Sequence, residues 1–235
     1  MHKTSSLIQL NNVSKTYPTS SGGVQALKDV TFAVQGGEFL AIIGKSGAGK
    51  STLVNMITGV DTLTSGTVQV DGVLVHDLSE NQRNVWRGRH IGIVYQSFEL
   101  LNQLSILDNV LLTMDFTGRF QRGKSRQIAM RLLDQMEISD HAMKHPAAIS
   151  GGQRQRVAIA RALANDPEII VADEPTGNLD SQTARTIMDL FQQLQQRGKT
   201  IVMVTHNQGL APYFTQIFQL ADGELSMWNK KRKHR

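Results

Sequence analysis

Short apolar runs bounded by glycine or polar residues recur along the chain and predict buried strands. Three of them read EFLAIIG at 38–44, IIVA at 169–172 and TIVMVT at 200–205. A continuous apolar run of this length is typical of a strand that is covered on both faces of a parallel sheet. The three runs therefore predict strands inside such a sheet.

The segments that follow these runs have apolar residues at helical spacing. After the first run, Leu53, Met56 and Ile57 recur at the period of a helix, and Gly59 supplies a glycine stop. From residue 153 onward, helical and strand patterns alternate along the chain. This alternation predicts an α/β fold with a doubly wound sheet.

Two regions differ from this alternation. Residues 7–75 contain the β patterns LIQLNNV, VTFAV and TVQVDGVLV separated by turns, which predicts an antiparallel subdomain beside the core. Residues 97–148 lack strand patterns and favour helices, so we expect a helical insertion there. We interpret the 235 residues as one domain with a core of about 1–96 and 149–228 and a basic tail at 229–235.

The residues between the first run and its helix match the phosphate loop G-x-x-x-x-G-K-[ST]. A predicted strand before the motif and a predicted helix after it are the context that supports this assignment. Its glycines let successive N–H groups point at phosphate oxygens at a helix N-terminus. Lys50 adds a charge for the phosphates, and the Ser51 hydroxyl is a ligand for Mg²⁺. The motif predicts a nucleotide-binding segment formed by Gly44, Lys45, Ser46, Gly47, Ala48, Gly49, Lys50, Ser51 and Thr52. The alternative is a glycine-rich turn that matches the motif by chance.

Two acidic residues come directly after the second run. Asp173 and Glu174 stand where the predicted strand leaves the sheet, and ligands of open α/β sheets lie at such carboxyl ends. An aspartate there can hold the hydration shell of Mg²⁺, and the adjacent glutamate can orient and deprotonate an attacking water. An acidic surface turn is the alternative. Together with the phosphate loop, the pair predicts hydrolysis of a nucleotide.

A second helix start suited to phosphate stands at ISGGQ, residues 149–153. Ser150 is a favourable N-cap, and the two glycines after it leave backbone N–H groups open. One compact subunit cannot hold the same γ-phosphate from both helix starts, at Lys50 and at Ser150, unless a second copy closes on it. The sequence therefore predicts a homodimer with the nucleotide sandwiched between two copies.

The order of these motifs resembles that of the ATP-binding-cassette (ABC) ATPases over nearly the whole chain. The resemblance implies an ABC nucleotide-binding domain, with a RecA-like P-loop core, an antiparallel β subdomain and an inserted α-helical subdomain. It also implies ATP and Mg²⁺ as cofactors, a D-loop at 177–180, and a coupling role for Gln96. The residues it assigns are Tyr17 (stacking on adenine), Ser150, Gly151, Gly152 and Gln153 for the nucleotide, Glu174, His206, Lys50 and Gln96 for catalysis, and Ser51, Gln96 and Asp173 for the metal.

Single members of this set have structural alternatives. Tyr17 alone is a packing aromatic at a strand end, and His206 alone is a core histidine. Ile149 departs from the family pattern, because the signature usually begins with leucine. It keeps an apolar residue of the same size, so we expect the dimer interface to be retained.

Two strings point to a subgroup within the ABC ATPases. ADEPTGNLDS at 172–181 and VYQSFELL at 94–101 look like those of lipoprotein-release and macrolide-export systems. The resemblance implies a subunit that hydrolyses ATP to power export, or mechanotransmission to an extracytoplasmic domain, through an integral membrane permease subunit. A non-transport ABC ATPase, such as a cell-division regulator, is the alternative. The sequence does not separate the two.

Composition limits the cellular setting. The chain has no cysteine, so it has no disulfide framework. Its apolar runs are too short to cross a bilayer, so any membrane association must come through a partner or an electrostatic contact. With the permease subunit that the resemblance implies, we expect a peripheral location at the cytoplasmic side of the inner membrane. The tail holds five of the 25 basic residues, which leaves 20 against 20 acidic ones and gives no sign of nucleic-acid binding. The tail is either a solvated end or a contact with the anionic membrane surface.

Overall fold

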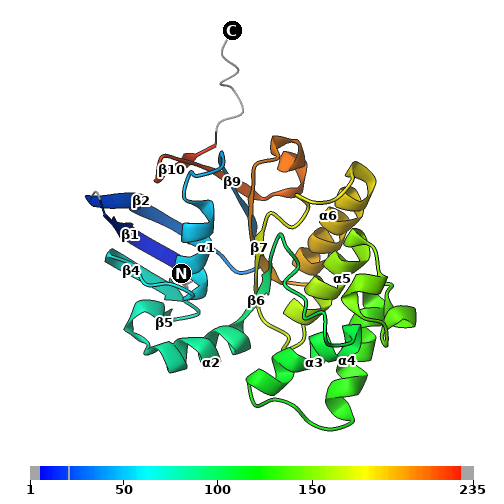
Figure 1. The fold of residues 1–235 in the computed structure, drawn as a ribbon. Helices are drawn as coiled ribbons and strands as arrows, with labels where there is room; N and C mark the ends of the chain where they lie inside the picture. Colours follow the sequence, from blue (N-terminus) through cyan, green and yellow to red (C-terminus); the bar gives the residue numbers. More distant parts are fainter. Residues whose placement is uncertain (1–5, 21, 229–235) are drawn as a thin grey trace, which may run out of the picture.

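The computed structural model describes residues 6–20 and 22–228, and its larger sheet is mainly parallel. Only β10 runs antiparallel to its neighbour, β9. The three apolar runs form strands that lie next to one another in this sheet (Figure 1). The strand order is β10 (Glu224–Met227), β9 (Gln216–Ala221), β3 (Phe39–Ile43), β8 (Thr200–Thr205), β7 (Ile169–Asp173) and β6 (Ile91–Val94).

A smaller antiparallel sheet lies beside the parallel one (Figure 1). The strands that pair in it all come from the segment whose sequence alternates between apolar and polar residues. The predicted antiparallel subdomain is therefore confirmed. Its order is β2 (Gly22–Val34), β1 (Ile8–Thr19), β4 (Ser65–Val70) and β5 (Val73–Leu74).

Side chains of the parallel strands alternate between two cores, because successive residues of a strand point to opposite faces. On β7, Ile169 and Val171 pack with α1 (Lys50–Thr58) and the antiparallel sheet. Ile170 and Ala172 pack in a separate core with the helices of the other face. Those helices are α3 (Ile106–Phe116), α4 (Lys124–Gln135), α5 (Gly151–Ala162) and α6 (Ser181–Gln196).

Local capping explains where the helices begin and end. Ser79, Ser105, Ser150 and Asp180 cap α2 (Glu80–His90), α3, α5 and α6 with their side chains, which satisfies backbone N–H groups at the helix starts. Gly59 ends α1 in the left-handed conformation, as the glycine stop predicts. Short 3₁₀ turns connect other elements, at Val75–Asp77, Ser139–His141, Pro146–Ala148 and Gln208–Tyr213.

Residues 97–148 contain α3 and α4 and no strand. The boundaries assigned to the helical insertion stay a prediction. Within the described residues, no helix is long and apolar enough to cross a membrane. The basic tail at 229–235 lies outside the described residues.

Candidate active site

The phosphate-loop motif lies between β3 and α1, where the sequence predicts it. The N–H of Gly44 donates to the carbonyl of Thr205 at 3.3 Å, which ties the start of the loop to the end of β8. Gly49 has a φ of +102°, and a Cβ there would lie 2.4 Å from the carbonyl oxygen of Ala26. A side chain would both strain φ and collide with backbone. The chain therefore needs glycine at this position to turn into α1.

Lys50 opens α1, and its ammonium group folds back onto the loop. Nζ donates to the carbonyl oxygens of Gly44 at 3.0 Å and Lys45 at 3.1 Å. The same nitrogen lies 3.3 Å from Oε1 of Glu174, and the Lys50 side chain is 7% exposed. This arrangement fixes a positive charge at the loop, beside N–H groups suited to phosphate. Ser46, Gly47, Ala48 and Thr52 complete the predicted nucleotide-binding segment.

Ser51 and Asp173 bring two oxygen donors together at the carboxyl end of β7. The Ser51 hydroxyl donates to Oδ2 of Asp173 at 3.1 Å. Burial is the largest influence on Asp173 and raises the pKa of its carboxyl group, and the charge of Glu174 acts in the same direction. The hydrogen bond from Ser51 and the charge of Lys50 lower that pKa but do not cancel the rise. A cation bound at this carboxylate would oppose the effect of burial.

A hydroxyl oxygen and a carboxylate oxygen are ligands that suit Mg²⁺, a hard cation. Mg²⁺ is usually held by one or two carboxylates together with phosphate oxygens and waters rather than by a complete cage of protein ligands. In keeping with that, the described residues contain no group of three or more His, Cys, Asp or Glu that could hold a metal. Gln96, the third predicted ligand, forms no hydrogen bond with Ser51 or Asp173 in the described part of the chain.

Glu174 is held in place by its backbone and by two nitrogen groups. It follows β7 in the left-handed conformation, with a φ of +46°. Its N–H donates to the carbonyl of Val204 at 2.9 Å, and its side chain is only 14% exposed. Oε2 lies 2.6 Å from Nδ1 of His206, while Oε1 is the atom that faces Lys50. The carboxylate therefore has a fixed orientation at the ends of two neighbouring parallel strands.

Gln96 lies against the turn that follows β7. The side-chain amide of Asn178 donates to the backbone carbonyl of Gln96 at 3.1 Å. A Cβ at Gly177 would lie 3.0 Å from Nε2 of Gln96, so a larger residue would crowd that side chain. The segment after β6 and the predicted D-loop before α6 are thus in direct contact.

Ser150 and Gln153 form a reciprocal capping box at the start of α5. The Ser150 hydroxyl accepts from the N–H of Gln153 at 3.3 Å, and the Gln153 side chain accepts from the N–H of Ser150 at 2.9 Å. A Cβ at Gly152 would lie 2.5 Å from Cγ2 of Thr183, whereas one at Gly151 would meet nothing closer than 3.9 Å. The start of α5 therefore packs tightly on the start of α6.

The predicted residues fall into two groups. The phosphate loop, the acidic pair and His206 meet at the carboxyl ends of β3, β7 and β8. The signature segment at 150–153 forms no hydrogen bond or ion pair with them in the described residues. The helix that it starts belongs to the core on the opposite face of the sheet from α1. One copy of the chain therefore does not bring its two phosphate-binding helix starts together.

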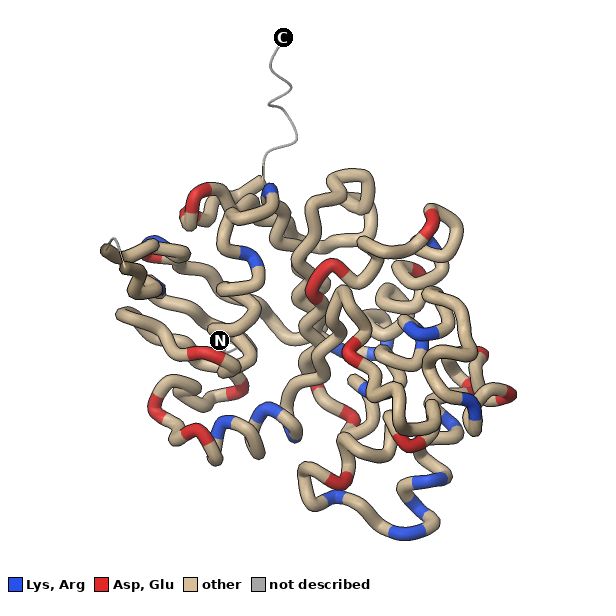
Figure 2. Tube along the Cα trace, in the orientation of Figure 1, with Lys and Arg blue, Asp and Glu red and all other residues tan. Residues whose placement is uncertain are grey.

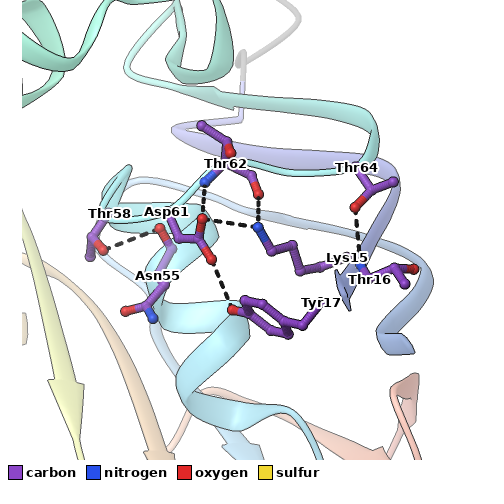
Figure 3. Close-up of polar contacts among 8 residues, drawn as sticks. All are labelled: Lys15, Thr16, Tyr17, Asn55, Thr58, Asp61, Thr62 and Thr64. Carbon is purple, nitrogen blue, oxygen red and sulfur yellow. Dashed lines mark hydrogen bonds and ion pairs between the residues drawn. The ribbon is translucent and has the colours of Figure 1, made fainter. Parts of the chain in front are cut away.

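Tyr17, near the end of β1, is held by an aspartate and a lysine (Figure 3). Its hydroxyl donates to Oδ2 of Asp61 at 2.9 Å. Nζ of Lys15 donates to Oδ1 of the same carboxylate at 2.9 Å and to the carbonyl of Thr62 at 2.6 Å. That nitrogen also lies 4.7 Å from the centre of the Tyr17 ring, within cation–π range. The cation therefore lies over one face of the ring.

The contacts in this cluster shift the pKa values of Tyr17 and Asp61 in opposite directions. Burial and then the hydrogen bond to Asp61 raise the pKa of the Tyr17 hydroxyl, so it stays a donor at neutral pH. Burial also acts to raise the pKa of Asp61, but hydrogen bonds from Lys15, the Thr62 N–H and Tyr17 outweigh it and lower that pKa. Asp61 is therefore an ionised acceptor that orients the ring.

Comparison with known proteins decides the family. Residues 27–177 match the family described as ABC transporter. The chain belongs to the ABC transporter family. LolD of Francisella tularensis subsp. tularensis, a lipoprotein-releasing system ATP-binding protein, is 40% identical over 222 residues, which cover 94% of this chain and 96% of LolD. MacB of Syntrophobacter fumaroxidans, a macrolide export ATP-binding/permease protein, is 42% identical over 221 residues, which cover 92% of this chain and 31% of MacB.

A solved structure shows the same fold in a dimer. MJ0796, an ATP-binding cassette of Methanocaldococcus jannaschii, was solved as a dimer in a post-hydrolysis state bound to ADP and Pi. It matches this ABC ATPase with a TM-score of 0.87 and 41% identity, over 94% of this chain and 99% of that one. The predicted fold class is confirmed, and the chain is an ATP-binding, ATP-hydrolysing subunit of the ABC type.

Sequence reasoning missed two residues that shape the site of this ABC ATPase. Asp61 and Lys15 orient Tyr17, yet Asp61 stands 44 positions further along the chain. No short motif links residues so far apart. The available signal was weak: an acid two residues beyond the glycine that ends α1, at the point where the chain turns toward the antiparallel sheet.

Proposed function

We propose that two copies of this ABC ATPase bind two ATP molecules at their shared interface, close, hydrolyse them and reopen. One observation carries the proposal: the helices that start at Lys50 and at Gly151 belong to cores on opposite faces of one sheet. A second copy is then needed to bring a signature segment to the γ-phosphate. The dimer of MJ0796 with ADP and Pi supports this arrangement.

The loop residues bind the phosphates in this proposal. Backbone N–H groups of 44–51 surround the β-phosphate, and Lys50 moves its contacts from the loop carbonyls to phosphate oxygens. Tyr17 stacks the ring face opposite Lys15 on the adenine while Asp61 holds the hydroxyl. Ser150, Gly151, Gly152 and Gln153 of the second copy complete the site.

Ser51 and Asp173 are the residues that would hold Mg²⁺. The Ser51 hydroxyl already donates a hydrogen bond to the Asp173 carboxylate, so the two oxygens are close together. When bound, the ion neutralises charge on the β- and γ-phosphate oxygens. We assign Gln96 to a contact that forms on closure and reports it to the helical insertion. The contact between Gln96 and the turn at Asn178 supports that relay.

Glu174 and His206 act on the attacking water. The water oxygen attacks the γ-phosphorus, and the bond from that phosphorus to the β–γ bridging oxygen breaks, so ADP leaves with the electron pair. Glu174 accepts the proton that the water loses, because it is a buried carboxylate with a fixed orientation. His206 holds that carboxylate and donates toward the γ-phosphate.

A groove at one end of the molecule supports the expectation that this chain binds a membrane subunit. It has a volume of about 640 Å³ and lies between α2, β6 and α3. Its apolar walls include Val85, Leu101 and Phe116, which are 43%, 46% and 77% exposed. Exposed apolar residues gathered around a groove mark interaction sites. We infer that a cytoplasmic helix of an integral membrane subunit docks here, as expected for a relative of LolD and MacB, and holds the ATPase at the inner membrane.

The basic tail at 229–235 remains a proposed contact with the anionic membrane surface, on its sequence alone. The described strand that leads to it, β10, lies at the end of the molecule opposite the groove (Figure 1). Deletion of the tail tests this directly, because binding to anionic vesicles falls only if the tail contributes.

Glu174→Gln tests the sandwich dimer. The change removes the base but keeps the size and hydrogen-bonding capacity of the side chain, so ATP and Mg²⁺ are expected to trap a stable dimer. Size-exclusion chromatography with saturating ATP measures it. Glu168→Gln is the matched control, since Glu168 precedes the same strand at its other end and is exposed. If Glu174→Gln stays monomeric with saturating ATP, the sandwich dimer is wrong, whatever the ATPase rate of the variant.

Purification with the membrane subunit separates transport from regulation. The transport reading predicts that the ATPase co-purifies with a permease whose substrate stimulates hydrolysis. Co-purification with a partner that moves no substrate and controls a peptidoglycan enzyme would favour the cell-division alternative instead.

A further inference from the structure

We propose that the segment 116–126, which joins α3 to α4, contacts the anionic lipid headgroups of the membrane surface. The segment reads FTGRFQRGKSR and includes four basic residues. From Phe116 to Leu133 the chain contains no aspartate or glutamate. We call residues 116–126 the basic loop. The proposal rests on the proposed function in one respect: the docked membrane subunit determines which side of the molecule faces the membrane.

The charges of the basic loop are available to an external partner. Arg119, Arg122, Lys124 and Arg126 are all exposed. In the described residues none of them takes part in an ion pair. Arg119 donates to the carbonyl of Asn165 at 3.0 Å, which ties the loop to the body of the protein. Figure 2 shows Lys and Arg gathered along this lowest part of the chain. A cluster of this kind attracts an anionic leaflet.

Two exposed aromatic residues lie among these charges. Phe116 is 77% exposed and Phe120 is 45% exposed. Phenylalanine next to arginine and lysine is the composition of surfaces that enter the headgroup region of a bilayer, where the rings reach apolar chains and the cations reach phosphates. The cations alone would attract an acidic protein face or an anionic leaflet equally, whereas exposed phenylalanines beside them add the apolar contact that a bilayer offers. The pairing of rings with cations therefore favours lipid.

The position of the loop agrees with this surface. Phe116 also lines the groove in which we place the membrane subunit, so the basic loop continues directly from that groove. Beside it, a cavity of about 770 Å³ is lined by Arg119, Lys124 and Arg131, whose donors suit a phosphodiester headgroup. Asp166 also lines this cavity, and its carboxylate is paired with Lys199. Both features lie at the end of the molecule away from β10 (Figure 1).

Partitioning of the intact chain onto vesicles tests the proposal. Arg122→Gln combined with Arg126→Gln removes two charges whose side chains form no hydrogen bond or ion pair in the described structure. Each basic residue at an anionic leaflet changes partitioning by about fivefold, so the pair is expected to weaken it about 25-fold. Co-sedimentation with phosphatidylglycerol vesicles at low salt measures the change, and vesicles of phosphatidylcholine alone supply the neutral baseline.

A matched pair on α6 controls for net charge. Arg185→Gln with Arg197→Gln makes the same chemical change at two exposed arginines, one in α6 and one directly after its end, and this helix lies far from the basic loop. We expect this control to change partitioning by less than about twofold. Equal losses for the two pairs would show a general charge effect and overturn the proposal. So would vesicle binding that disappears completely when residues 229–235 are deleted.

A fluorescent residue tests for contact at the loop itself. Phe120→Trp in a Trp228→Phe background places a reporter at an exposed site, and the Trp228→Phe variant alone supplies the emission of the remaining tryptophan, Trp86, which is 7% exposed. A blue shift with anionic vesicles is the expected result; its absence would contradict insertion of the ring. If the Arg122 and Arg126 changes spare vesicle binding but abolish co-purification with the membrane subunit in neutral lipid, the loop binds an acidic protein face. The Glu174→Gln dimer assay on the same variants keeps this outcome separate from failure of the proposed function.

Discussion

Nδ1 of His206 lies 2.6 Å from Oε2 of Glu174, although the two residues follow different strands. They meet because β7 and β8 are parallel neighbours whose carboxyl ends reach the same edge of the sheet. The two side chains differ in their surroundings, since that of His206 is 61% exposed and that of Glu174 is 14% exposed. The histidine is thus the member of the pair that can reach a ligand outside the protein.

His206→Ala is expected to reduce kcat for ATP hydrolysis by about 100-fold or more, because positioned acid–base groups contribute about that factor. KM for ATP is expected to change little, since the phosphate loop and Tyr17 are untouched. Steady-state ATPase assays measure both constants. His145→Ala is the control, because His145 is an exposed histidine outside the site. An unchanged kcat would remove His206 from the mechanism.

Gly152→Ala is expected to destabilise the protein by about 1–3 kcal/mol, the usual cost of forcing one extra carbon into a packed contact. The new methyl group would meet Cγ2 of Thr183, whose hydroxyl is fixed by a hydrogen bond to Asp180 at 2.6 Å. Urea unfolding measures the loss. Gly151→Ala is the matched control, because its Cβ would make only ordinary van der Waals contacts, at 3.9 Å. Thr183→Ser removes the methyl and keeps the hydroxyl, so it is expected to rescue Gly152→Ala; failure to rescue would contradict the steric explanation.

The sequence predicts those parts of the site that are local in the chain. A phosphate loop, an acid pair after a buried strand and a serine before two glycines each contain their chemistry within a few residues. The parallel strands are predictable for the same reason, because their apolar runs are continuous. The glycine stop at Gly59 and the cap at Ser150 are likewise properties of single positions.

Contacts between distant segments are outside the reach of such patterns. The bond from Tyr17 to Asp61 and the packing of Gly152 on Thr183 join residues that only the fold brings together. α2 is hard to recognise because Trp86 is its only buried side chain, so it lacks an apolar stripe. The basic loop has charges that are plain in the sequence, but its relation to the groove depends on the fold.

Leu101→Glu is expected to weaken binding of the membrane subunit by about tenfold or more, because a charge would enter the apolar groove. Basal ATPase activity is expected to stay within about twofold, since a 46% exposed side chain can place the charge in water when the subunit is free. Leu74→Glu is the control, at a leucine of 41% exposure on β5. Co-purification and substrate-stimulated ATPase activity measure the effect. Equal losses of basal activity and partner binding would indicate a packing role.

The same reasoning extends to Phe98, which is half-buried and not fully enclosed. Its ring lies 5.4 Å from the guanidinium of Arg154 in α5, and its carbonyl accepts a hydrogen bond from Arg161, which lines the groove. Replacing the ring would therefore disturb the signature helix directly and the groove through its neighbour Arg161. We therefore expect Phe98→Glu to lower both partner binding and ATP-driven dimer formation. A variant that lost only partner binding would show that the contact with Arg154 is dispensable.

Asp61→Asn is expected to lower the free energy of unfolding by about 0.5–1 kcal/mol at neutral pH, because it removes the charge that faces Lys15. The pKa of Asp61 in the folded protein is below its ordinary value of 3.8, so its ionised form stabilises the fold above that pH. The difference between the wild type and the variant is therefore expected to shrink as the pH falls below about 4. Urea unfolding from pH 3 to 7 measures it. Tyr17→Phe keeps the ion pair but loses one of the hydrogen bonds that lower the pKa of Asp61, so its pH dependence is expected to have the same direction as in the wild type and a smaller size. A difference independent of pH for Asp61→Asn would show that charge plays no part in holding the ring.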